Sequence, residues 1–407
     1  MGIDKAINIA DLRRMCQRRL PRIAFDYIEG GVEDERGMGT NEAGFLRYRL
    51  VPRYLVDVGK RDLSTTLFGK TYSLPFGFGP TGTMGLFRRG SELMLAQAAR
   101  DANVPYVMSG ASNASIEAAA RIAPDNLWYQ LYAATNPAIC EDLLRRARDA
   151  GVKVLMVTVD VPVRTRRERN IRNGFNFRHR LKPSIVAEAL LHPAWVIEYL
   201  RHGGAPILDN WVAYAPQGAN AIDVAEFFNS QVPASSQTWR ELETYRKLWP
   251  GTLVVKGIMR PDDAEQAVAL GADGILVSNH GGRQLDRAPA PVDVFPAIDA
   301  AVGDRATLML DSGIRRASDI ITALCVGAKY TFLGRAGLYG VSAGGLAGAK
   351  KVIEILRSEL DLNMGQMGCP TIADLGPDSL WTESDVAPVV RRAPAAEAAP
   401  IVRAVGA

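Results

Sequence analysis

Short apolar segments alternate along the chain with longer segments in which apolar residues recur every three or four positions. Short segments rich in β-branched and aromatic residues are typical of buried strands, and the longer pattern is typical of amphipathic helices. The predicted strands are Leu74–Gly79, Tyr106–Ser109, Leu127–Leu131, Val152–Val159, Leu253–Lys256, Gly274–Ser278, Thr307–Leu310 and Tyr330–Leu333. The predicted helices between them include Gly90–Ala102, Pro137–Ala150, Pro261–Leu270, Pro291–Val302 and Ser318–Val326. This alternation predicts an α/β fold, a (β/α)8 TIM barrel.

Three segments lie outside this repeat. The pattern of Ile9–Arg36 predicts a helical N-terminal extension, and Val352–Leu360 is interpreted as the helix that closes the barrel. The segment Pro388–Ala407 is rich in alanine, proline, valine and arginine and has no periodicity, which is typical of disorder. We therefore expect residues 1–387 to form one barrel domain and residues 388–407 to form a disordered tail.

The connection between the fourth and fifth predicted strands, Pro162–Thr252, is far longer than an ordinary loop. Its first part, Arg164–Lys182, holds eight basic residues against Glu168 alone. The following stretch, Ile185–Leu200, is apolar but too short and too charged to span a bilayer. Together with Trp195, this composition favours an insertion that contacts a membrane surface. A solvated lid and an oligomer interface are the alternatives.

Composition limits the class of protein. With 47% hydrophobic and 23% charged residues the chain is typical of a soluble enzyme, and a net charge of +4 is too small to indicate a nucleic-acid partner. The four cysteines have no spacing that would bind a metal, so we expect no metal and a reducing compartment. Because Met1–Lys5 has no apolar signal core, we expect a protein that is cytoplasmic or peripheral on the inner face of the cell membrane.

The run Ser278–Asp286 holds the most informative residue. His280 follows a predicted strand, whereas the other three histidines share one basic stretch. Histidine is the side chain best suited to accept a proton near neutral pH. Arg283, three residues later, can bind a carboxylate with two parallel hydrogen bonds. A base beside a carboxylate-binding group indicates chemistry on an acid next to its carboxyl group.

Polar residues collect at the predicted strand ends, where barrels of this type hold their active sites. They are Thr81, Ser109, Gln130, Tyr132, Thr158, Asp160, Lys256, Ser278, His280, Asp311, Ser312 and Arg335, and Pro80, Gly82, Gly313 and Gly334 lie beside them at the same strand ends. A purely structural barrel has no need of so many hydrogen-bonding groups in these positions.

The last two strand ends predict a phosphate site. Gly313 and Arg315 follow the seventh strand, and Gly334 and Arg335 follow the eighth, which is the usual place for phosphate in such barrels. The charge of Asp311 would repel a bare phosphate, but its carboxylate would bind the hydroxyls of a sugar-like chain. A phosphorylated ribityl chain satisfies both requirements.

The middle of the barrel completes the prediction of FMN. Lys256 could place a positive charge where a reduced isoalloxazine gathers negative charge. Gln130, Thr158 and Ser278 could hydrogen-bond the edge of the ring. Nicotinamide binding is disfavoured, because Pro80 removes a backbone N–H from the GxGxxG match at Gly77–Gly82.

These residues resemble the family of FMN-dependent enzymes that oxidise 2-hydroxy acids. The resemblance covers roughly Asp4 to Trp381. Its motifs are Leu20–Gly31, Gln130–Tyr132, Thr158–Asp160, Arg166–Glu168, Val255–Gly257, Ser278–Asp286, Asp311–Arg315 and Leu333–Arg335.

The resemblance implies a role for each site residue. His280 would be the base and Asp160 the partner of the imidazolium, with Tyr132 as a third catalytic group. The substrate would be held by Tyr27, Tyr132, Arg167 and Arg283, with Gly82 and Ala111 beside it. Lys256 would face the flavin N1/C2 carbonyl, and Arg315 and Arg335 would hold the phosphate. By the same resemblance we expect a homo-oligomer, a tetramer.

Several stretches are most similar to members that dehydrogenate (S)-mandelate at a membrane. Ala111 is small where other members have a bulky aromatic residue, which leaves room for a phenyl ring. Gly82 replaces an alanine typical of oxygen-using members, which favours a slow reaction with oxygen. Arg164 departs from the mandelate pattern and could alter substrate choice. The prediction is oxidation of mandelate, or a ring-substituted mandelate, with a membrane quinone as acceptor.

Three alternatives stay open at this stage. The first is a cytosolic oxidase of the lactate type, which would pass electrons to oxygen and make hydrogen peroxide. The second is a phosphate-binding isomerase or lyase without flavin. The third is a binding scaffold with no catalytic activity.

Overall fold

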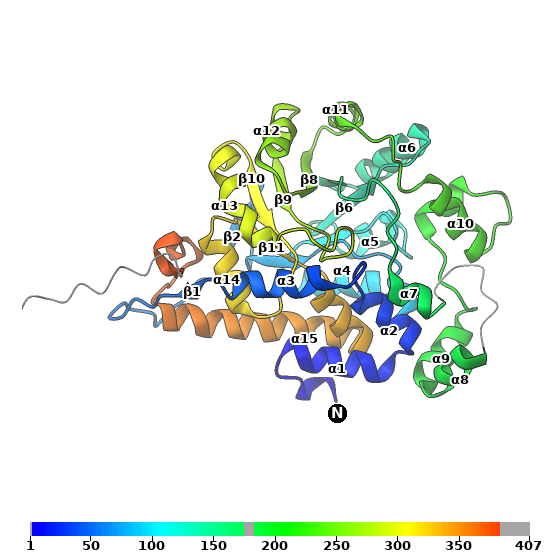
Figure 1. Cartoon of the computed structure of the whole chain (residues 1–407), viewed down its shortest axis with the longest axis horizontal. Coiled ribbons are helices and arrows are strands. Elements are labelled where there is room, and N and C mark those ends of the chain that lie inside the picture. The colour runs from blue at the N-terminus through cyan, green and yellow to red at the C-terminus, as the bar shows by residue number, and fades with distance from the viewer. Residues whose placement is uncertain (1, 175–182, 383–407) are drawn as a thin grey trace, which may run out of the picture.

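The computed structural model describes residues 2–174 and 183–382, and its centre is a closed barrel of eight parallel strands (Figure 1). In chain order these strands are β4 (Phe76–Phe78), β5 (Tyr106–Met108), β6 (Leu127–Tyr132), β7 (Val154–Thr158), β8 (Thr252–Ile258), β9 (Gly274–Val277), β10 (Thr307–Leu310) and β11 (Tyr330–Leu333). Each strand pairs with its neighbour in sequence, and β11 pairs with β4, with Thr331 opposite Phe76. The predicted (β/α)8 barrel is confirmed.

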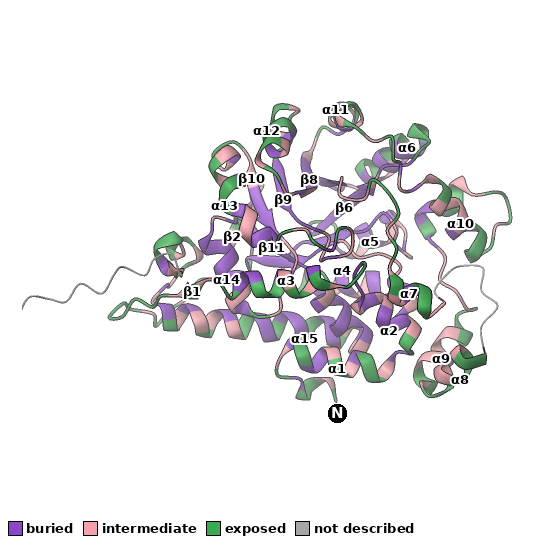
Figure 2. Ribbon diagram, in the orientation of Figure 1, coloured by how far each residue is buried: buried purple, intermediate pink, exposed green. Residues whose placement is uncertain are grey.

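The inside of the barrel changes from apolar to polar along the strands. Trp128 of β6 and Met156 of β7 belong to one buried apolar cluster in the barrel. Because side chains on a strand alternate with a period of two, Gln130 and Thr158 point to the same side as these residues, nearer the carboxyl ends. Figure 2 shows these strands as the buried centre of the molecule. The polar residues predicted from the sequence therefore lie together at one end of the barrel.

A short hairpin contributes to the apolar cluster. Its strands are β2 (Thr65–Leu67) and β3 (Lys70–Tyr72), which pair antiparallel. Leu67 and Tyr72 of the hairpin join the cluster, and Trp128 Nε1 donates to Tyr72 Oη at 3.3 Å. These contacts exclude water from the apolar part of the barrel.

Helices surround the strands, with mixed exposed and buried faces in Figure 2. They are α4 (Ser91–Asp101), α5 (Ile116–Ile122), α6 (Pro137–Asp149), α12 (Pro261–Ala269), α13 (Pro291–Val302), α14 (Ala317–Cys325) and α15 (Arg335–Met367). The predicted closing helix Val352–Leu360 is only part of α15, which begins directly after β11 and changes direction at Gly345, where φ is 60°. Helix α15 packs against α1 and α4.

The N-terminal extension is helical, as its pattern predicted, and is divided into three helices. It forms α1 (Ile9–Arg19), α2 (Arg22–Glu29) and α3 (Arg36–Phe45). Pro21 lacks a backbone N–H and begins a new helix. Helix α2 ends at Glu29, and residues 30–35 form an irregular link to α3. A short antiparallel pair, β1 (Arg49–Leu50) with β12 (Leu380–Trp381), joins this region to the end of the described chain.

The long insertion after β7 is present. Its elements are α7 (Glu168–Arg172), α8 (Pro183–Leu190), α9 (Pro193–Arg201), the 3-10 helix η3 (Asp209–Tyr214), α10 (Ala221–Gln231) and α11 (Trp239–Leu248). Part of its basic stretch and the predicted tail Pro388–Ala407 lie outside the described residues.

Helix α9 corrects the role predicted for Trp195. The Trp195 ring packs against the core of the protein, and its Nε1 donates to Leu86 O at 2.8 Å. The same ring stacks on Tyr199 of α9. Glu198, on the same helical face, accepts from Arg89 N at 2.7 Å. Trp195 is partly buried and anchors α9 to the barrel domain.

Candidate active site

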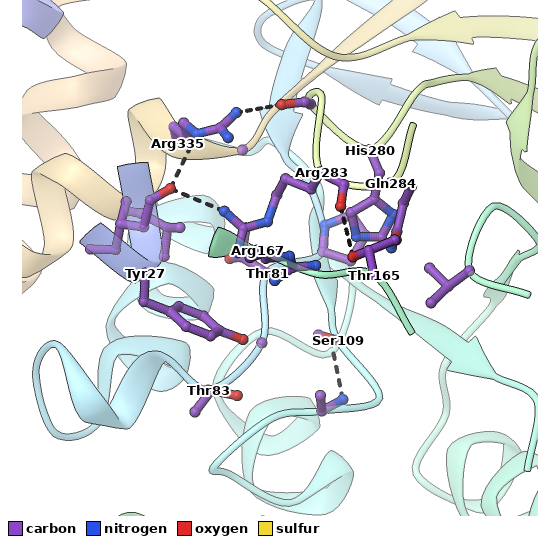
Figure 3. Close-up of a pocket in the computed structure, with 18 of the residues that line it drawn as sticks. Tyr27, Thr81, Thr83, Ser109, Thr165, Arg167, His280, Arg283, Gln284 and Arg335 are labelled. Atoms are coloured by element: carbon purple, nitrogen blue, oxygen red, sulfur yellow. Dashed lines mark hydrogen bonds between the residues drawn. The ribbon is translucent and has the colours of Figure 1, made fainter. Parts of the chain in front are cut away.

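A cavity of about 480 Å³ lies at the carboxyl ends of the strands (Figure 3). Most of the predicted site residues line it: Tyr27, Pro80, Thr81, Gly82, Ser109, Ala111, Tyr132, Arg167, Lys256, His280, Arg283, Asp311, Ser312, Gly313, Arg315, Gly334 and Arg335. The structure thus brings together residues from the N-terminal extension, the insertion and the strand ends.

Four predicted residues lie behind this lining. Gln130, Thr158 and Ser278 are buried in the barrel at the carboxyl ends of their strands, and Asp160 contacts His280. The three buried groups are placed to hydrogen-bond a molecule in the cavity from the barrel side. Asp160 is placed to act through the imidazole.

The backbone turns sharply at His280, where φ is 57°, in the left-handed region that is uncommon for residues other than glycine. The turn is held because His280 N donates to Ser278 Oγ at 3.1 Å and Gly281 N donates to Ser312 Oγ at 3.0 Å. Nδ1 of the imidazole lies 2.8 Å from Asp160 Oδ1. This contact leaves Nε2 as the ring nitrogen for a group in the cavity.

The charges around His280 favour a neutral imidazole. Burial lowers the pKa of His280, Asp160 opposes this effect, and the Lys256 ammonium adds to it, so the pKa lies below its ordinary value. Burial would raise the pKa of Asp160, but His280 and Lys256 outweigh it and hold that pKa below its usual range. A neutral imidazole beside an ionised carboxylate is the arrangement that a general base requires.

Lys256 lies at the centre of this polar end. Its Nζ donates to Ser278 Oγ at 2.9 Å and lies 3.5 Å from Asp160 Oδ2 and 3.7 Å from Asp311 Oδ2. Burial disfavours the ammonium, but Asp160 and Asp311 overcome this effect and raise the pKa of Lys256. The side chain therefore stays positively charged within the barrel.

Two arginines approach the cavity near His280 without a carboxylate partner among the described residues. Arg283 Nη1 donates to Gly30 O at 2.7 Å, and its guanidinium lies 5.3 Å from the centre of the Tyr27 ring. Arg167 is the N-cap of α7, and its buried Nε has no hydrogen-bond partner in the described chain. Burial, with the positive charges of Arg167 and Arg335, lowers the pKa of Arg283. A bound anion would relieve this repulsion.

A second positive region lies after β10 and β11. Arg335 donates to Gly281 O at 2.8 Å and to Gly30 O at 3.0 Å, while Arg315 pairs with Glu42 at 3.0 Å. Burial, together with the charge of Arg315, lowers the pKa of Arg335 to about 10. Two adjacent cations at the edge of the cavity favour an anion there, although their donors also bind protein groups.

The two tyrosines predicted to contact substrate both line the cavity (Figure 3 labels Tyr27). Burial raises the pKa of Tyr132 to about 12, although Lys256 opposes the shift. The phenol of Tyr132 is therefore neutral at physiological pH and can donate its proton in a hydrogen bond.

Unsatisfied polar atoms test whether the residues fit FMN. Gln130 Oε1 accepts from Ser109 Oγ and from Gly110 N, each at 3.2 Å, but Gln130 Nε2 has no partner in the described part of the chain. Thr158 Oγ1 is also buried and without a partner there. Buried polar groups are nearly always paired, so these atoms indicate a polar ligand edge. A flavin ring, with its alternating carbonyl and N–H groups, fits this requirement.

The sequence analysis missed the group that holds the His280 loop from outside the barrel. Asn41 of α3 exchanges hydrogen bonds with Asn279: Asn41 Nδ2 donates to Asn279 Oδ1 at 2.9 Å, and Asn279 Nδ2 donates to Asn41 Oδ1 at 2.6 Å. Asp286 Oδ1 accepts from Gly37 N at 2.8 Å. Asn41 lies more than two hundred residues from its partner, so no local pattern could have indicated this contact.

The insertion supplies an apolar wall that the sequence analysis also missed. Leu208, Phe228 and Val232 line the cavity together with Val161, which follows β7. Arg164 lines it too and donates to Asn229 O and, at 3.1 Å, to Val232 O. Arg164 therefore links the β7 loop to the end of α10.

Comparisons with known proteins place this site in context. The model of the family described as FMN-dependent dehydrogenase matches residues 16–382. The chain is 40% identical to (S)-mandelate dehydrogenase of Pseudomonas putida over 384 residues, which covers 94% of this chain and 96% of that protein. It is 37% identical to an L-lactate dehydrogenase of Chromohalobacter salexigens over 383 residues, covering 94% and 97%.

Solved structures agree with these relatives. The crystal structure of the monotopic membrane protein (S)-mandelate dehydrogenase superposes with a TM-score of 0.90 at 40% identity, covering 93% of this chain and all of that one (100%). A crystal structure of mandelate oxidase superposes with a TM-score of 0.78 at 32% identity, covering 93% and 99%.

Proposed function

Because the chain belongs to the family of FMN-dependent dehydrogenases, we propose that it oxidises (S)-mandelate, or a ring-substituted mandelate, to the 2-oxo acid. Its cofactor is FMN, and the family acts on 2-hydroxy acids. One observation carries the proposal: the His280–Asp160 pair faces the cavity that Arg167 and Arg283 also enter. A base and two cations without a carboxylate partner among the described residues suit an acid with a reactive C2 position.

The substrate carboxylate binds between Arg167 and Arg283. Both guanidinium groups line the cavity, and a carboxylate between them would offset the repulsion that lowers the pKa of Arg283. Binding there directs C2 toward His280, whose Nε2 takes the proton that the substrate releases. Asp160 then stabilises the imidazolium, and Tyr27 and Tyr132 contribute further hydrogen bonds to the substrate. Bound FMN supplies the acceptor for the two electrons.

The remaining polar residues hold the cofactor. Arg315 and Arg335, with the backbone at Gly313 and Gly334, would bind the phosphate, and Asp311 the ribityl hydroxyls. The edge of the ring would pair with Gln130, Thr158, Ser109 and Ser278. The charge of Lys256 would stabilise the reduced ring at N1, and the segment Pro80, Thr81 and Gly82 would lie beside it.

An aromatic substrate is supported by the shape of the cavity. Ala111 occupies little space, and the neighbouring wall includes Leu208 and Phe228. Apolar side chains of this kind contribute free energy by removing an aromatic ring from water. L-Lactate dehydrogenases are also among the relatives, so lactate is the second candidate substrate.

We place the enzyme at a membrane surface, with a quinone as acceptor. No helix in the described ranges, 2–174 and 183–382, is long and apolar enough to cross a membrane. Helices α8 and α9 have no buried residues. The exposed apolar side chains of these helices and of the link between them are Val186, Leu190, Leu191, Ile197 and Leu200. Such a surface suits insertion into the headgroup region of a bilayer. The relative of known structure is itself described as a monotopic membrane protein.

A substrate panel assayed with two acceptors tests this proposal. The purified holoenzyme is given (S)-mandelate, (R)-mandelate and (S)-lactate with either a quinone-like dye or oxygen. We expect the highest kcat/KM for (S)-mandelate with the dye. A higher kcat/KM for (S)-lactate would show that lactate is the substrate. Peroxide formation as fast as dye reduction would show that oxygen is the acceptor.

A further inference from the structure

An arginine outside the cavity joins the insertion to the N-terminal extension. Arg169 of α7 forms ion pairs with two acids, through Nη1 to Asp26 Oδ1 of α2 at 3.4 Å and through Nη2 to Glu35 Oε2. Asn173 adds a hydrogen bond from Nδ2 to Asp26 Oδ2 at 2.6 Å. None of these four residues lines the cavity. We call Asp26, Arg169 and Glu35 the α2–α7 bridge.

The bridge is more shielded than an ordinary surface ion pair. The side chains of Asp26 and Glu35 are 11% and 17% exposed, and that of Arg169 is 33% exposed. Glu35 uses its second oxygen to accept from Gly31 N at 3.1 Å. Because shielded pairs with several hydrogen bonds are weakened less by water and salt than exposed pairs, the bridge can restrain the two segments.

Each of the three bridge residues lies close to a residue that lines the cavity. Arg167, the N-cap of α7, lies two residues before Arg169, and Tyr27 follows Asp26 on α2. Gly30 lies in the link between α2 and α3 that also holds Glu35, and the Gly30 carbonyl accepts from Arg283 Nη1 at 2.7 Å. The bridge thus lies behind three residues that the proposed function assigns to the substrate.

A restraint is needed here because the cavity side is repulsive. Arg167 and Arg283 approach each other without a carboxylate between them in the described chain, so their charges favour movement of α7 away from the barrel. Helix α7 has five residues, of which only Asn170 is buried, so apolar packing holds it weakly. The attraction of Arg169 to Asp26 and Glu35 acts against this movement.

We propose that Arg169 is a positioning residue, which holds α7 against α2 so that Arg167, Arg283 and Tyr27 form one preassembled carboxylate site. The inference rests on the proposed function, because it needs the substrate carboxylate to bind between Arg167 and Arg283. It concerns affinity for the acid more than the rate of the chemical step. Once substrate is bound, its own charge holds the arginines together.

Substitution of Arg169 tests the inference on the FMN-loaded protein. Arg169→Met removes both ion pairs and keeps an unbranched chain about as long as the aliphatic stem of arginine, whereas Arg169→Lys keeps the positive charge. The control is Arg172→Met, which removes the exposed pair with Glu168 from the same helix. Binding of phenylglyoxylate, the 2-oxo acid product of mandelate, is measured from the change in the flavin spectrum, and KM and kcat are measured with (S)-mandelate.

We expect Arg169→Met to raise the Kd and the KM about tenfold or more, with kcat within about threefold of the parent and FMN content unchanged. Arg169→Lys should recover at least part of the affinity, and Arg172→Met should match the parent. Parent affinity in FMN-loaded Arg169→Met overturns the inference. If that variant does not retain FMN, Glu35→Gln decides: parent affinity in FMN-loaded Glu35→Gln overturns the inference, and weaker binding supports it.

A further variant separates this inference from the proposed function. Arg167→Met should weaken phenylglyoxylate binding more than Arg169→Met does. If Arg167→Met binds like the parent, the assigned carboxylate site is wrong and the positioning role of Arg169 falls with it. If only Arg169→Met binds like the parent, the carboxylate site stands and the positioning role alone is wrong.

Discussion

Nδ1 of His280 lies 2.8 Å from Asp160 Oδ1, so one nitrogen of the ring is committed to a buried carboxylate and the other is left for the cavity. The carboxylate fixes the orientation of the ring and the tautomer with a proton on Nδ1. Lys256 lies 3.5 Å from the other oxygen of Asp160, which keeps the carboxylate ionised. Base, carboxylate and lysine therefore act as one electrostatic unit at the end of the barrel.

The pH dependence of kcat/KM should follow the pKa of His280 in this unit. Only neutral His280 can accept a proton, so the rate rises as pH rises through the pKa of His280. Because that pKa is lowered, the acid limb should lie below the ordinary value of about 6.5. Asp160→Asn removes the charge that raises this pKa, so the limb should move to still lower pH. The maximal rate should also fall by about 10²–10⁴, the usual contribution of general base catalysis. A limb that moves to higher pH would contradict the assignment.

The carboxylate site predicts a strong difference between arginine and lysine at position 283. Arg283→Lys keeps the charge but loses the planar pair of donors. Loss of one charge-assisted hydrogen bond costs about 1.5–3 kcal/mol, so kcat/KM for (S)-mandelate should fall about ten- to a hundredfold. The control substrate is 1-phenylethanol, which lacks the carboxylate. An equal loss with this alcohol would show that Arg283 has another role.

The small side chain of Ala111 should favour (S)-mandelate, because it leaves room for the phenyl ring that (S)-lactate lacks. Ala111 lines the cavity, and its Cβ would lie only 2.9 Å from a Cβ added at Gly82, so this part of the site has little spare space. Ala111→Leu should lower kcat/KM for (S)-mandelate by about tenfold or more, since overpacking costs about 1–3 kcal/mol. The value for (S)-lactate should stay within about threefold. An equal decrease for both acids would mean that the ring binds elsewhere.

The exposed leucines of the insertion predict membrane binding. Leu190 and Leu191 are 65% and 76% exposed, and burial of a leucine contributes about 1.5–3 kcal/mol. Leu190→Ser with Leu191→Ser should therefore lower partitioning onto anionic lipid vesicles at least about tenfold, as measured by co-sedimentation. Leu362→Ser is the matched control, because Leu362 is 62% exposed on α15. Equal binding by the parent and the double variant would contradict a role for this surface.

The barrel and its polar end could be predicted because both follow from local pattern. Gly274–Val277 is a short apolar run, and its polar continuation at Ser278 must lie at the carboxyl end of the strand. A parallel barrel brings all such ends to one rim, so Asp160 and His280 meet although 120 residues separate them. Family resemblance then assigned roles that geometry alone leaves open.

Contacts between distant segments account for what the sequence did not reveal. The glycines of α15 disfavour a helix, but a Cβ at Gly340 would lie 2.5 Å from Gly348 O, so the close packing there requires glycine. Trp195 lies in a segment whose composition is typical of a membrane contact, yet its Nε1 donates to Leu86 O and the ring packs against the barrel domain. Asn41 holds the His280 loop from α3, and no pattern in its own helix marks it.

Anaerobic reduction of the bound flavin is the most direct test of the central claim, that His280 serves as the base in FMN-dependent oxidation of an (S)-2-hydroxy acid. The holoenzyme is mixed with (S)-mandelate or (R)-mandelate without an acceptor, and the loss of flavin absorbance is followed. The parent should be reduced by the (S) enantiomer alone. His280→Ala should retain FMN and be reduced several powers of ten more slowly. A parent flavin that stays oxidised with every 2-hydroxy acid, or a His280→Ala rate within about tenfold of the parent, would contradict the account.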